Sequence, residues 1–347
     1  MTKRWLCVCI ATVLFAFSFC FSSCRGEQKQ YSVTSFDSFD TVTTVMGYAE
    51  SEEEFARVSG EMLAMLAEYH RMFDIYHSYE GMENLCTVNE RAGKEEVAVN
   101  GEIIELLLYG KEVYALTDGA VNIAMGNVLS LWHTCRAEAA ENPEQAKLPD
   151  PEALAEARIH TQIEDLCMDE EKGTVSFSDP LLQLDVGAIA KGYAVEKIAK
   201  AMEEKGVSGY VLNAGGNVRV IGEKPSGSPW IVGIENQKEG EDYLARLSLT
   251  REALVTSGTH QRYYTVDGVR YHHIIDPDTG MPARGYSSAS VVSSDSAMAD
   301  ALSTALFCMS SEEGMALVES LSDAEAIWLL EDGTKRMSSD FEKYCQP

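Results

Sequence analysis

The stretch from 184 to 193 reads Leu184-Asp185-Val186-Gly187-Ala188-Ile189-Ala190-Lys191-Gly192-Tyr193. It predicts a strand that runs directly into a helix, with small residues at the junction and a lysine one turn into the helix. Helix N-termini with exposed amides attract anions, and a lysine there adds a point charge. The Gly-Lys-[Ser/Thr] ending of a Walker A loop is missing, so an ordinary helix start with a solvated lysine is the alternative.

A second segment, residues 293–306, places Asp300 and Thr304 four residues apart on one face of a predicted helix. The alanines around them allow that face to approach another backbone closely. A carboxylate and a hydroxyl, completed by a carbonyl and by water and phosphate oxygens, suit Mg²⁺. The alternative is an amphipathic helix whose polar residues cap it or face the solvent.

A third segment, residues 271–280, carries two adjacent histidines before an Asp-Pro-Asp-Thr-Gly turn. Alternation along a strand puts His272 and His273 on opposite faces, which argues against a zinc site built from the pair. One of them can face a site as an acid, a base or a phosphate donor, while the other packs or meets solvent. The glycines in residues 213–217 and 256–258 permit close backbone approach to a ligand, but also occur in ordinary hairpins.

The predicted elements around these segments include more strands than helices. Helical spacing marks 51–70, 101–117, 188–205, 295–309 and 312–321, and strand-like runs mark 39–48, 174–178, 181–186, 210–213, 217–221, 230–235, 244–249, 262–266, 270–275 and 287–293. Residues 138–158, rich in Ala and Glu and interrupted by prolines, indicate a surface excursion. Because strands often follow one another through short turns, we expect an α+β fold with mostly antiparallel sheets and packed helices.

The N-terminus predicts export. Lys3 and Arg4 precede an apolar run that ends at Phe21, shorter than the roughly 20 residues that span a bilayer, and Ser22-Ser23-Cys24 resembles a lipobox. We expect a lipoprotein signal peptide over 1–23, lipidation of Cys24, a tether over 24–38 and the functional domain over 39–347. An ordinary cleaved secretory signal, or Cys20 as the modified residue, is the alternative.

The composition excludes one class of partner. The 347-residue chain has 28 Lys and Arg against 55 Asp and Glu, a net charge of −27. So acidic a chain lacks the basic patch that binds phosphate backbones, and we expect no nucleic acid partner. The cysteines beyond the N-terminal segment form no Cys-x-x-Cys pair, which fits neither a zinc site nor a disulfide framework: Cys86, Cys135, Cys167, Cys308 and Cys345.

Taken in order along the chain, these segments resemble the serial signature of the ApbE-type flavin transferases, the FAD:protein FMN transferases. The resemblance runs through residues 184–195, 213–219, 256–258, 273–277 and 299–305. It implies an ApbE-like (T-fold-like) architecture and an enzyme that splits FAD with Mg²⁺, releases AMP and attaches FMN through a phosphoester to a Thr or Ser of an acceptor flavoprotein. Members are typically exported lipoproteins, which implies a bacterial cell envelope protein anchored by lipid in the membrane and facing outside the cytoplasm.

The resemblance also implies roles for residues at matching positions. The implied FAD contacts are Met46, Tyr76, Ala120, Val121, Asn122, Asp185, Lys191 and Ile275, and the implied metal ligands are the Ala188 carbonyl, Asp300 and Thr304. His273 matches the histidine held to be essential in the transfer. Two departures stand out, because Tyr48 replaces a usual Thr and Val121-Asn122 replaces Phe-Asp. Asn keeps the shape of Asp but cannot serve as a base.

Three other functions stay open from the sequence. The same site with water as acceptor would make an Mg²⁺-dependent FAD pyrophosphatase that gives FMN and AMP. A non-catalytic FAD-binding lipoprotein gains weight from the departure at Asn122. The third function is that of an acidic surface lipoprotein that contacts other proteins. Whether the protein binds FAD at all would distinguish this function from the others.

Overall fold

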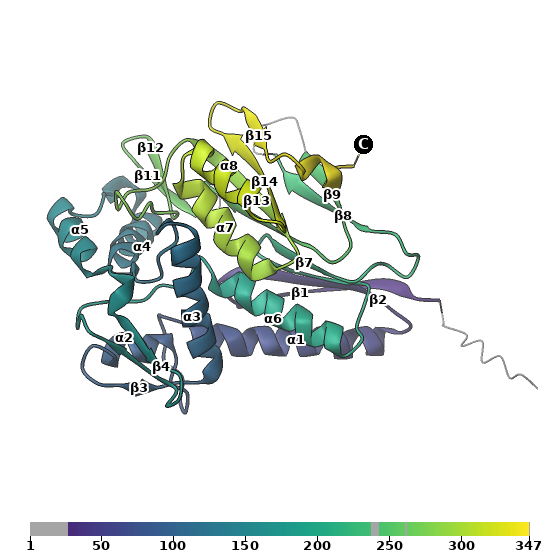
Figure 1. Cartoon of the computed structure of the whole chain (residues 1–347), viewed down its shortest axis with the longest axis horizontal. Helices are drawn as coiled ribbons and strands as arrows, with labels where there is room; N and C mark the ends of the chain where they lie inside the picture. The colour runs from purple at the N-terminus through teal and green to yellow at the C-terminus, as the bar shows by residue number, and fades with distance from the viewer. Residues whose placement is uncertain (1–26, 237–242, 261, 347) are drawn as a thin grey trace, which may run out of the picture.

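The computed structural model describes residues 27–236, 243–260 and 262–346, and its largest element is an eight-stranded sheet (Figure 1). The order across the sheet is β1-β2-β6-β7-β10-β13-β14-β15, and every neighbouring pair is antiparallel. The strands are β1 Lys29–Ser38, β2 Thr41–Ala49, β6 Tyr210–Ala214, β7 Asn217–Ile221, β10 Ala253–Gly258, β13 Tyr286–Ser293, β14 Ala324–Leu330 and β15 Lys335–Met337. The predicted α+β fold with mostly antiparallel sheets is confirmed.

Helices cover one face of this sheet: α1 Glu52–Phe73, α6 Ala190–Glu204, α7 Ser296–Cys308 and α8 Ser311–Ser320. Figure 1 shows α6 and α7 side by side across the strands. The other face is covered by the hairpin of β8 Trp230–Glu235 and β9 Tyr243–Leu249, and by the 3₁₀ turn Phe341–Tyr344. Strand alternation separates the two cores, because Val45 packs on the helix side and Met46 on the hairpin side.

A second group of elements lies at one end of the sheet (Figure 1). It contains α2 Leu85–Arg91, α3 Gly101–Leu116, α4 Gly126–Glu141, α5 Pro151–Ala157, a small sheet of β3 Val97–Ala98, β5 Thr174–Phe177 and β4 Leu166–Asp169, and the hairpin of β11 Tyr263–Val266 and β12 Val269–His272. Trp132 fixes α4 against that hairpin. Its ring lies 6.0 Å from Tyr271 and 6.4 Å from Tyr264, and its Nε1 donates to Gly280 O over 2.8 Å.

Two sequence predictions are wrong in this fold. Residues 29–38 are not part of a tether: they form edge strand β1, whose backbone pairs with β2 from Lys29 opposite Ala49 onward. Residues 181–186 are not a strand, because Asn89 binds the amide and the carbonyl of Leu184 with its own side chain and so takes the place of a partner strand.

The surface excursion expected at 138–158 holds more regular structure than its composition indicated. Its first residues are the last turn of α4, and Asp150 caps α5 by accepting from the amides of Glu152 and Ala153, both at 3.0 Å. Residues 1–23 and Cys24 lie outside the described residues. Within the ranges that the structure describes, none of the helices is long and apolar enough to cross a membrane.

Candidate active site

Helices α6 and α7 approach each other most closely at Gly192. Its amide donates to Asp300 Oδ2 over 2.7 Å, and Lys191 Nζ lies 2.9 Å from Asp300 Oδ1. A Cβ added at Gly192 would lie 2.3 Å from Asp300 Cβ and 2.6 Å from Ser296 O, so only glycine fits there. The structure therefore joins the two segments that the sequence singled out, 184–193 and 293–306, into one site.

A buried ion pair holds the two helices in this position. Arg219 on β7 donates from Nε to Glu196 Oε2 over 2.9 Å and from Nη2 to Glu196 Oε1 over 3.2 Å. Glu196, on α6, also accepts from the amide of Ser296 over 2.7 Å, at the first residue of α7. Both charged side chains are only 4% exposed, and the bidentate geometry provides the pairing that buried charges require.

The segments that meet at Gly192 carry oxygen atoms of the kinds that Mg²⁺ prefers. Ala188 lies just before α6, and no hydrogen bond to its carbonyl is found in the described part of the chain. Thr304 follows Asp300 by one turn of α7 and is half-buried. Within the described ranges no group of three or more His, Cys, Asp and Glu side chains could hold a metal, so a cation here would depend on one carboxylate, a hydroxyl and a carbonyl.

The two adjacent histidines have different surroundings. His272 is buried: its Nε2 donates to Ala283 O over 2.7 Å and its Nδ1 accepts from the amide of Ile274. His273 lies just beyond β12, and its Nδ1 donates to Arg262 O over 3.2 Å, which leaves Nε2 with a free lone pair. Burial and the charges of Arg262 and Arg136 lower the pKa of His273 to about 3, so its ring is neutral at physiological pH. The two rings therefore have different partners and different burial.

Asp185 lies in the loop before α6, and a backbone hydrogen bond joins this loop to the segment of Ile123. Its amide donates to Ile123 O over 2.9 Å, and its own Oδ1 accepts from the Gly187 amide over 2.8 Å. Burial raises the pKa of Asp185, while the Gly187 amide and the charge of Arg136 lower it. Asp185 therefore lies within electrostatic reach of α4.

Tyr76 is presented by a tight turn after α1. Buried Asp74 organises this turn by accepting from the amides of Tyr76 and His77 and from Tyr79 Oη, at 2.7, 3.1 and 2.8 Å. The Tyr76 side chain is 57% exposed, and its ring stacks on His133 with centroids 5.1 Å apart. Its flat face is therefore available to an aromatic ligand.

The segment of Ala120, Val121 and Asn122 contributes mainly structure. Val121 is buried, and the Asn122 side chain accepts from the Ala124 amide over 2.8 Å and donates to Thr161 O over 2.9 Å. An Asp could make only the first of these bonds. The departure at Asn122 therefore has a physical reason: its amide ties the loop to residue 161.

Ile275 and the turn that follows it connect β12 to α4. Ile275 is buried in the cluster that contains Trp132, and Asp276 closes the turn by accepting from the Asp278 amide and from Thr279 Oγ1. The turn ends at Gly280, whose backbone has a φ of 69° and whose carbonyl accepts from Trp132. The Asp-Pro-Asp-Thr-Gly motif thus positions α4.

Met46 is separated from the other predicted residues. It packs in the cluster between the sheet and the β8–β9 hairpin, on the face opposite α6 and α7, and its Sδ accepts from Gln30 Nε2 over 2.7 Å. The β1–β2 turn reaches the site instead, because Arg262 donates to Asp40 O over 2.8 Å and lies 3.5 Å from the Asp40 carboxylate.

The two glycine segments have structural roles. Residues 213–217 form the β6–β7 hairpin turn, where Gly215 and Gly216 have φ values of 58° and 88°. Residues 256–258 end β10, and Ser257 Oγ lies 2.8 Å from Ser303 Oγ on α7. Both segments therefore support the strands and the helix that carry the site.

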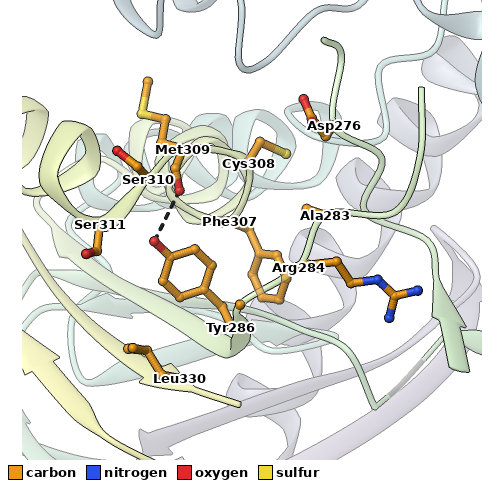
Figure 2. A pocket seen from close by; sticks show the side chains of 11 residues that line it. Asp276, Ala283, Arg284, Tyr286, Phe307, Cys308, Met309, Ser310, Ser311 and Leu330 are labelled. Carbon is orange, nitrogen blue, oxygen red and sulfur yellow. Dashed lines mark hydrogen bonds between the residues drawn. The ribbon is translucent and has the colours of Figure 1, made fainter. Parts of the chain in front are cut away.

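A cavity of about 320 Å³ opens beside the last turn of α7 (Figure 2). Its lining includes Asp276, Arg284, Tyr286 and Cys308, and Tyr286 Oη donates to Met309 O over 3.1 Å. Because Cys308 follows Thr304 at four-residue spacing, the cavity adjoins the site one turn further along α7. Burial raises the pKa of Cys308 to about 12, so it is a thiol at neutral pH.

Sequence reasoning missed four residues that meet near Asp185 and His273: Asp40, His133, Arg136 and Arg262. They come from three distant segments and share no motif. The one signal was Trp132, an aromatic residue four positions before Arg136 on a helix that the sequence did not predict. Of these four, Arg136 and Arg262 are cations that can bind a phosphate-bearing ligand, as Lys191 can, and the neutral His273 can accept a proton.

Comparisons with known proteins agree on one family. The ApbE family model matches residues 37–328. A Treponema pallidum (strain Nichols) FAD:protein FMN transferase is 31% identical over 270 residues, 74% of this chain and 73% of that protein, and one from Klebsiella pneumoniae (strain 342) is 28% identical over 278 residues, 78% and 84%.

Solved structures give the same result. The ApbE protein of Thermotoga maritima superposes with a TM-score of 0.80 at 29% identity, covering 92% of this chain and all of that one. The flavin transferase ApbE of Vibrio cholerae superposes with a TM-score of 0.76 at 27% identity, covering 91% and 99%.

Proposed function

The chain belongs to the ApbE family, and from this membership we propose that it is an Mg²⁺-dependent FAD:protein FMN transferase that modifies a Thr or Ser of an acceptor flavoprotein. The acceptor hydroxyl oxygen bonds to the FMN-side phosphorus of FAD, and the bond from that phosphorus to the bridging oxygen breaks. AMP leaves with the bridging oxygen, and the hydroxyl proton goes to the enzyme. The product is FMN in phosphoester linkage to the acceptor.

The observation that carries this proposal is the Asp300 carboxylate, buried between Lys191 and the Gly192 amide at the start of α6. A helix N-terminus with a lysine favours a phosphate group, and the carboxylate would attract a divalent cation to the same place. Ala188 O, Asp300 and Thr304 would hold Mg²⁺. The cation, when bound, stabilises the negative charge that develops on the diphosphate.

His273 is proposed as the group that takes the acceptor proton. Because Nδ1 donates to Arg262 O, the ring is fixed as the tautomer with an available Nε2 lone pair. The lowered pKa keeps that lone pair unprotonated at neutral pH. The same lone pair would serve water as well as a hydroxyl, so FAD hydrolysis to FMN and AMP is the second candidate function.

Asp185, Tyr76 and Ile275 are proposed to position the nucleotide. Tyr76 offers an exposed aromatic face, and Asp185 lies within electrostatic reach of Tyr76. Ala120, Val121 and Asn122 shape the neighbouring loop, and Asn122 is tied to Thr161 by a bond that an Asp could not make. The departure at Asn122 is therefore no argument for a non-catalytic FAD-binding protein.

We also propose that the protein is a lipoprotein of the bacterial cell envelope, anchored through Cys24 and working outside the cytoplasm. The basis is the basic, apolar and small-residue order of residues 1–24. Because β1 begins at Lys29, only a short segment would separate the anchor from the domain. Replacing Cys24 with Ser should release the protein from membranes into a soluble fraction, and unchanged membrane association of that variant would contradict the anchor.

The test of the transfer is incubation of the protein with FAD, Mg²⁺ and a candidate flavoprotein acceptor, followed by mass spectrometry of the acceptor. Covalent FMN on a Thr or Ser, dependent on Mg²⁺ and absent with Asp300→Ala, supports the proposal. Release of FMN and AMP without modified acceptor would favour the pyrophosphatase instead.

A further inference from the structure

Two arginines lie close together at one end of the site. Arg136 is on α4 and Arg262 directly precedes β11, and the charge of Arg262, together with burial, lowers the pKa of Arg136. Trp132 brings the two segments together, because it is fixed to the β11–β12 hairpin one helical turn before Arg136. Like charges repel, so two neighbouring guanidinium groups are unexpected in a chain with 55 acidic residues.

Among the described residues, the acidic groups near this pair form no ion pair with Arg136. Asp40 lies 3.5 Å from Arg262, and its side chain is 98% exposed. Asp185 directs Oδ1 to the Gly187 amide. No carboxylate forms an ion pair with Arg136 in residues 27–236, 243–260 and 262–346, where its one side-chain partner is the His133 ring, Nη2 lying 3.0 Å from Nδ1.

His133 fixes Arg136 without cancelling its charge. A guanidinium can only donate, so His133 Nδ1 accepts and its ring is the neutral form. Burial and the charge of Arg136 lower the pKa of His133, in agreement with this protonation state. His133 in turn stacks on the exposed ring of Tyr76 at 5.1 Å.

A planar cation beside an exposed aromatic face has a definite ligand chemistry. Guanidinium groups bind phosphate through paired hydrogen bonds, and two of them relieve their mutual repulsion around one anion. The Tyr76 face can stack on an aromatic ring of the same molecule. A phosphate and an aromatic ring in one ligand indicate a nucleotide.

We propose that Arg136, oriented by His133 and flanked by Arg262, binds a phosphate group of the flavin nucleotide. This inference rests on the proposed function and adds residues to its site that lie outside the motifs of the 184–193 and 293–306 segments. The phosphate belongs either to the FMN half or to the AMP half of FAD, and the two halves can be tested separately.

The experiment measures the equilibrium affinities of FAD, FMN, AMP and riboflavin for the wild-type protein and for Arg136→Gln. Loss of a charged hydrogen-bond partner should weaken FAD binding about tenfold or more, and change riboflavin binding less than about twofold. Arg136→Lys should retain part of the affinity. The matched control Arg91→Gln removes a cation that pairs with Glu83 and Glu95 on the surface, and should leave all four affinities unchanged.

The monophosphate, FMN or AMP, that binds more weakly to Arg136→Gln than to the wild type identifies the half of FAD that Arg136 contacts. Unchanged FAD affinity in Arg136→Gln would overturn the proposal, and so would an equal loss for FAD and riboflavin, or an effect confined to the KM for the acceptor protein. If Arg136→Gln unfolds, Arg136→Lys takes its place in the experiment. Wild-type FAD affinity of Arg136→Lys at both high and low salt would overturn the proposal. FAD binding that depends on Arg136 without any FMN transfer would contradict the proposed function alone.

Discussion

The Gly192 amide donates to Asp300 Oδ2 over 2.7 Å, so a backbone group of one helix binds the carboxylate that the next helix presents. This contact is possible because Gly192 has no Cβ, and it gives a partner to an amide of the first turn of α6, which has no carbonyl of its own helix to bind. The same contact buries the carboxylate against the start of α6.

Gly192→Ala is expected to damage both stability and activity. The added Cβ would meet Asp300 Cβ at 2.3 Å and a backbone oxygen at 2.6 Å, so α6 and α7 must separate. Overpacking of this kind costs about 1–3 kcal/mol of unfolding free energy. Denaturant unfolding and FMN transfer rates measure the two effects.

Gly60→Ala is the matched control for that variant, because Gly60 lies exposed on α1 with nothing within 4 Å of its added Cβ. It should stabilise the protein by roughly 0.5–1 kcal/mol without changing transfer. Equal effects of Gly192→Ala and Gly60→Ala on unfolding free energy and transfer rate would contradict the role of Gly192 in the close approach of α6 and α7.

Glu196→Ala should be among the most destabilising single changes in the site. It leaves Arg219 buried with backbone carbonyls as hydrogen-bond partners and Glu203 at 3.6 Å as its remaining carboxylate, and it removes the acceptor for the Ser296 amide. Breaking one side of a buried pair costs about 3–5 kcal/mol. Thermal or denaturant unfolding checks this.

Glu138→Ala is the comparison, since Glu138 pairs with Lys147 on the surface at 3.2 Å and should contribute little. A loss for Glu196→Ala no larger than that of Glu138→Ala would show that the pair does not hold the helices together.

Asn122→Asp restores the residue type of the family signature and is expected to lower the melting temperature. The carboxylate still accepts from the Ala124 amide but can no longer donate to Thr161 O, which costs about 1–3 kcal/mol. Asn127→Asp, which loses a comparable bond to Leu181 O on the exposed surface, should cost less. Equal stability of wild type and Asn122→Asp would mean that the bond to Thr161 is not formed in solution.

The pH dependence of transfer tests the state of His273. Because its pKa is lowered to about 3, the ring is neutral above that pH and becomes protonated only as the pH falls towards 3. The kcat/KM for transfer, which reports the free enzyme, should therefore have no histidine limb between about pH 5.5 and pH 7.5. An acid limb near the ordinary histidine pKa of about 6.5 in the wild-type profile would contradict the lowered value.

The sequence predicted the parts of this site that depend on local pattern. Helical spacing predicted Asp300 and Thr304 on one helix, as the structure confirms, and the two histidines that the sequence set apart have different partners. The strand expected at 181–186 failed because Asn89, far away in the chain, binds the Leu184 backbone through its side chain.

Residues brought together by packing could not be predicted in the same way. Arg136 reaches Arg262 because Trp132 packs on Tyr264 and Tyr271, a contact between segments more than a hundred residues apart. Met46, by contrast, was predicted at the site but lies on the other face of the sheet. Its motif resembled a flavin contact, but the side of β2 that faces the helices is fixed by the pairing of β1 and β6 on either side of it.

The most direct test of the central claim is the mass of an acceptor flavoprotein after incubation with FAD, Mg²⁺ and either the wild-type protein or Asp300→Ala. We predict covalent FMN on one Thr or Ser with the wild type, none without Mg²⁺, and none with Asp300→Ala of confirmed fold. Full FMN attachment by Asp300→Ala, or intact FAD and unmodified acceptor with the wild type, would contradict the account.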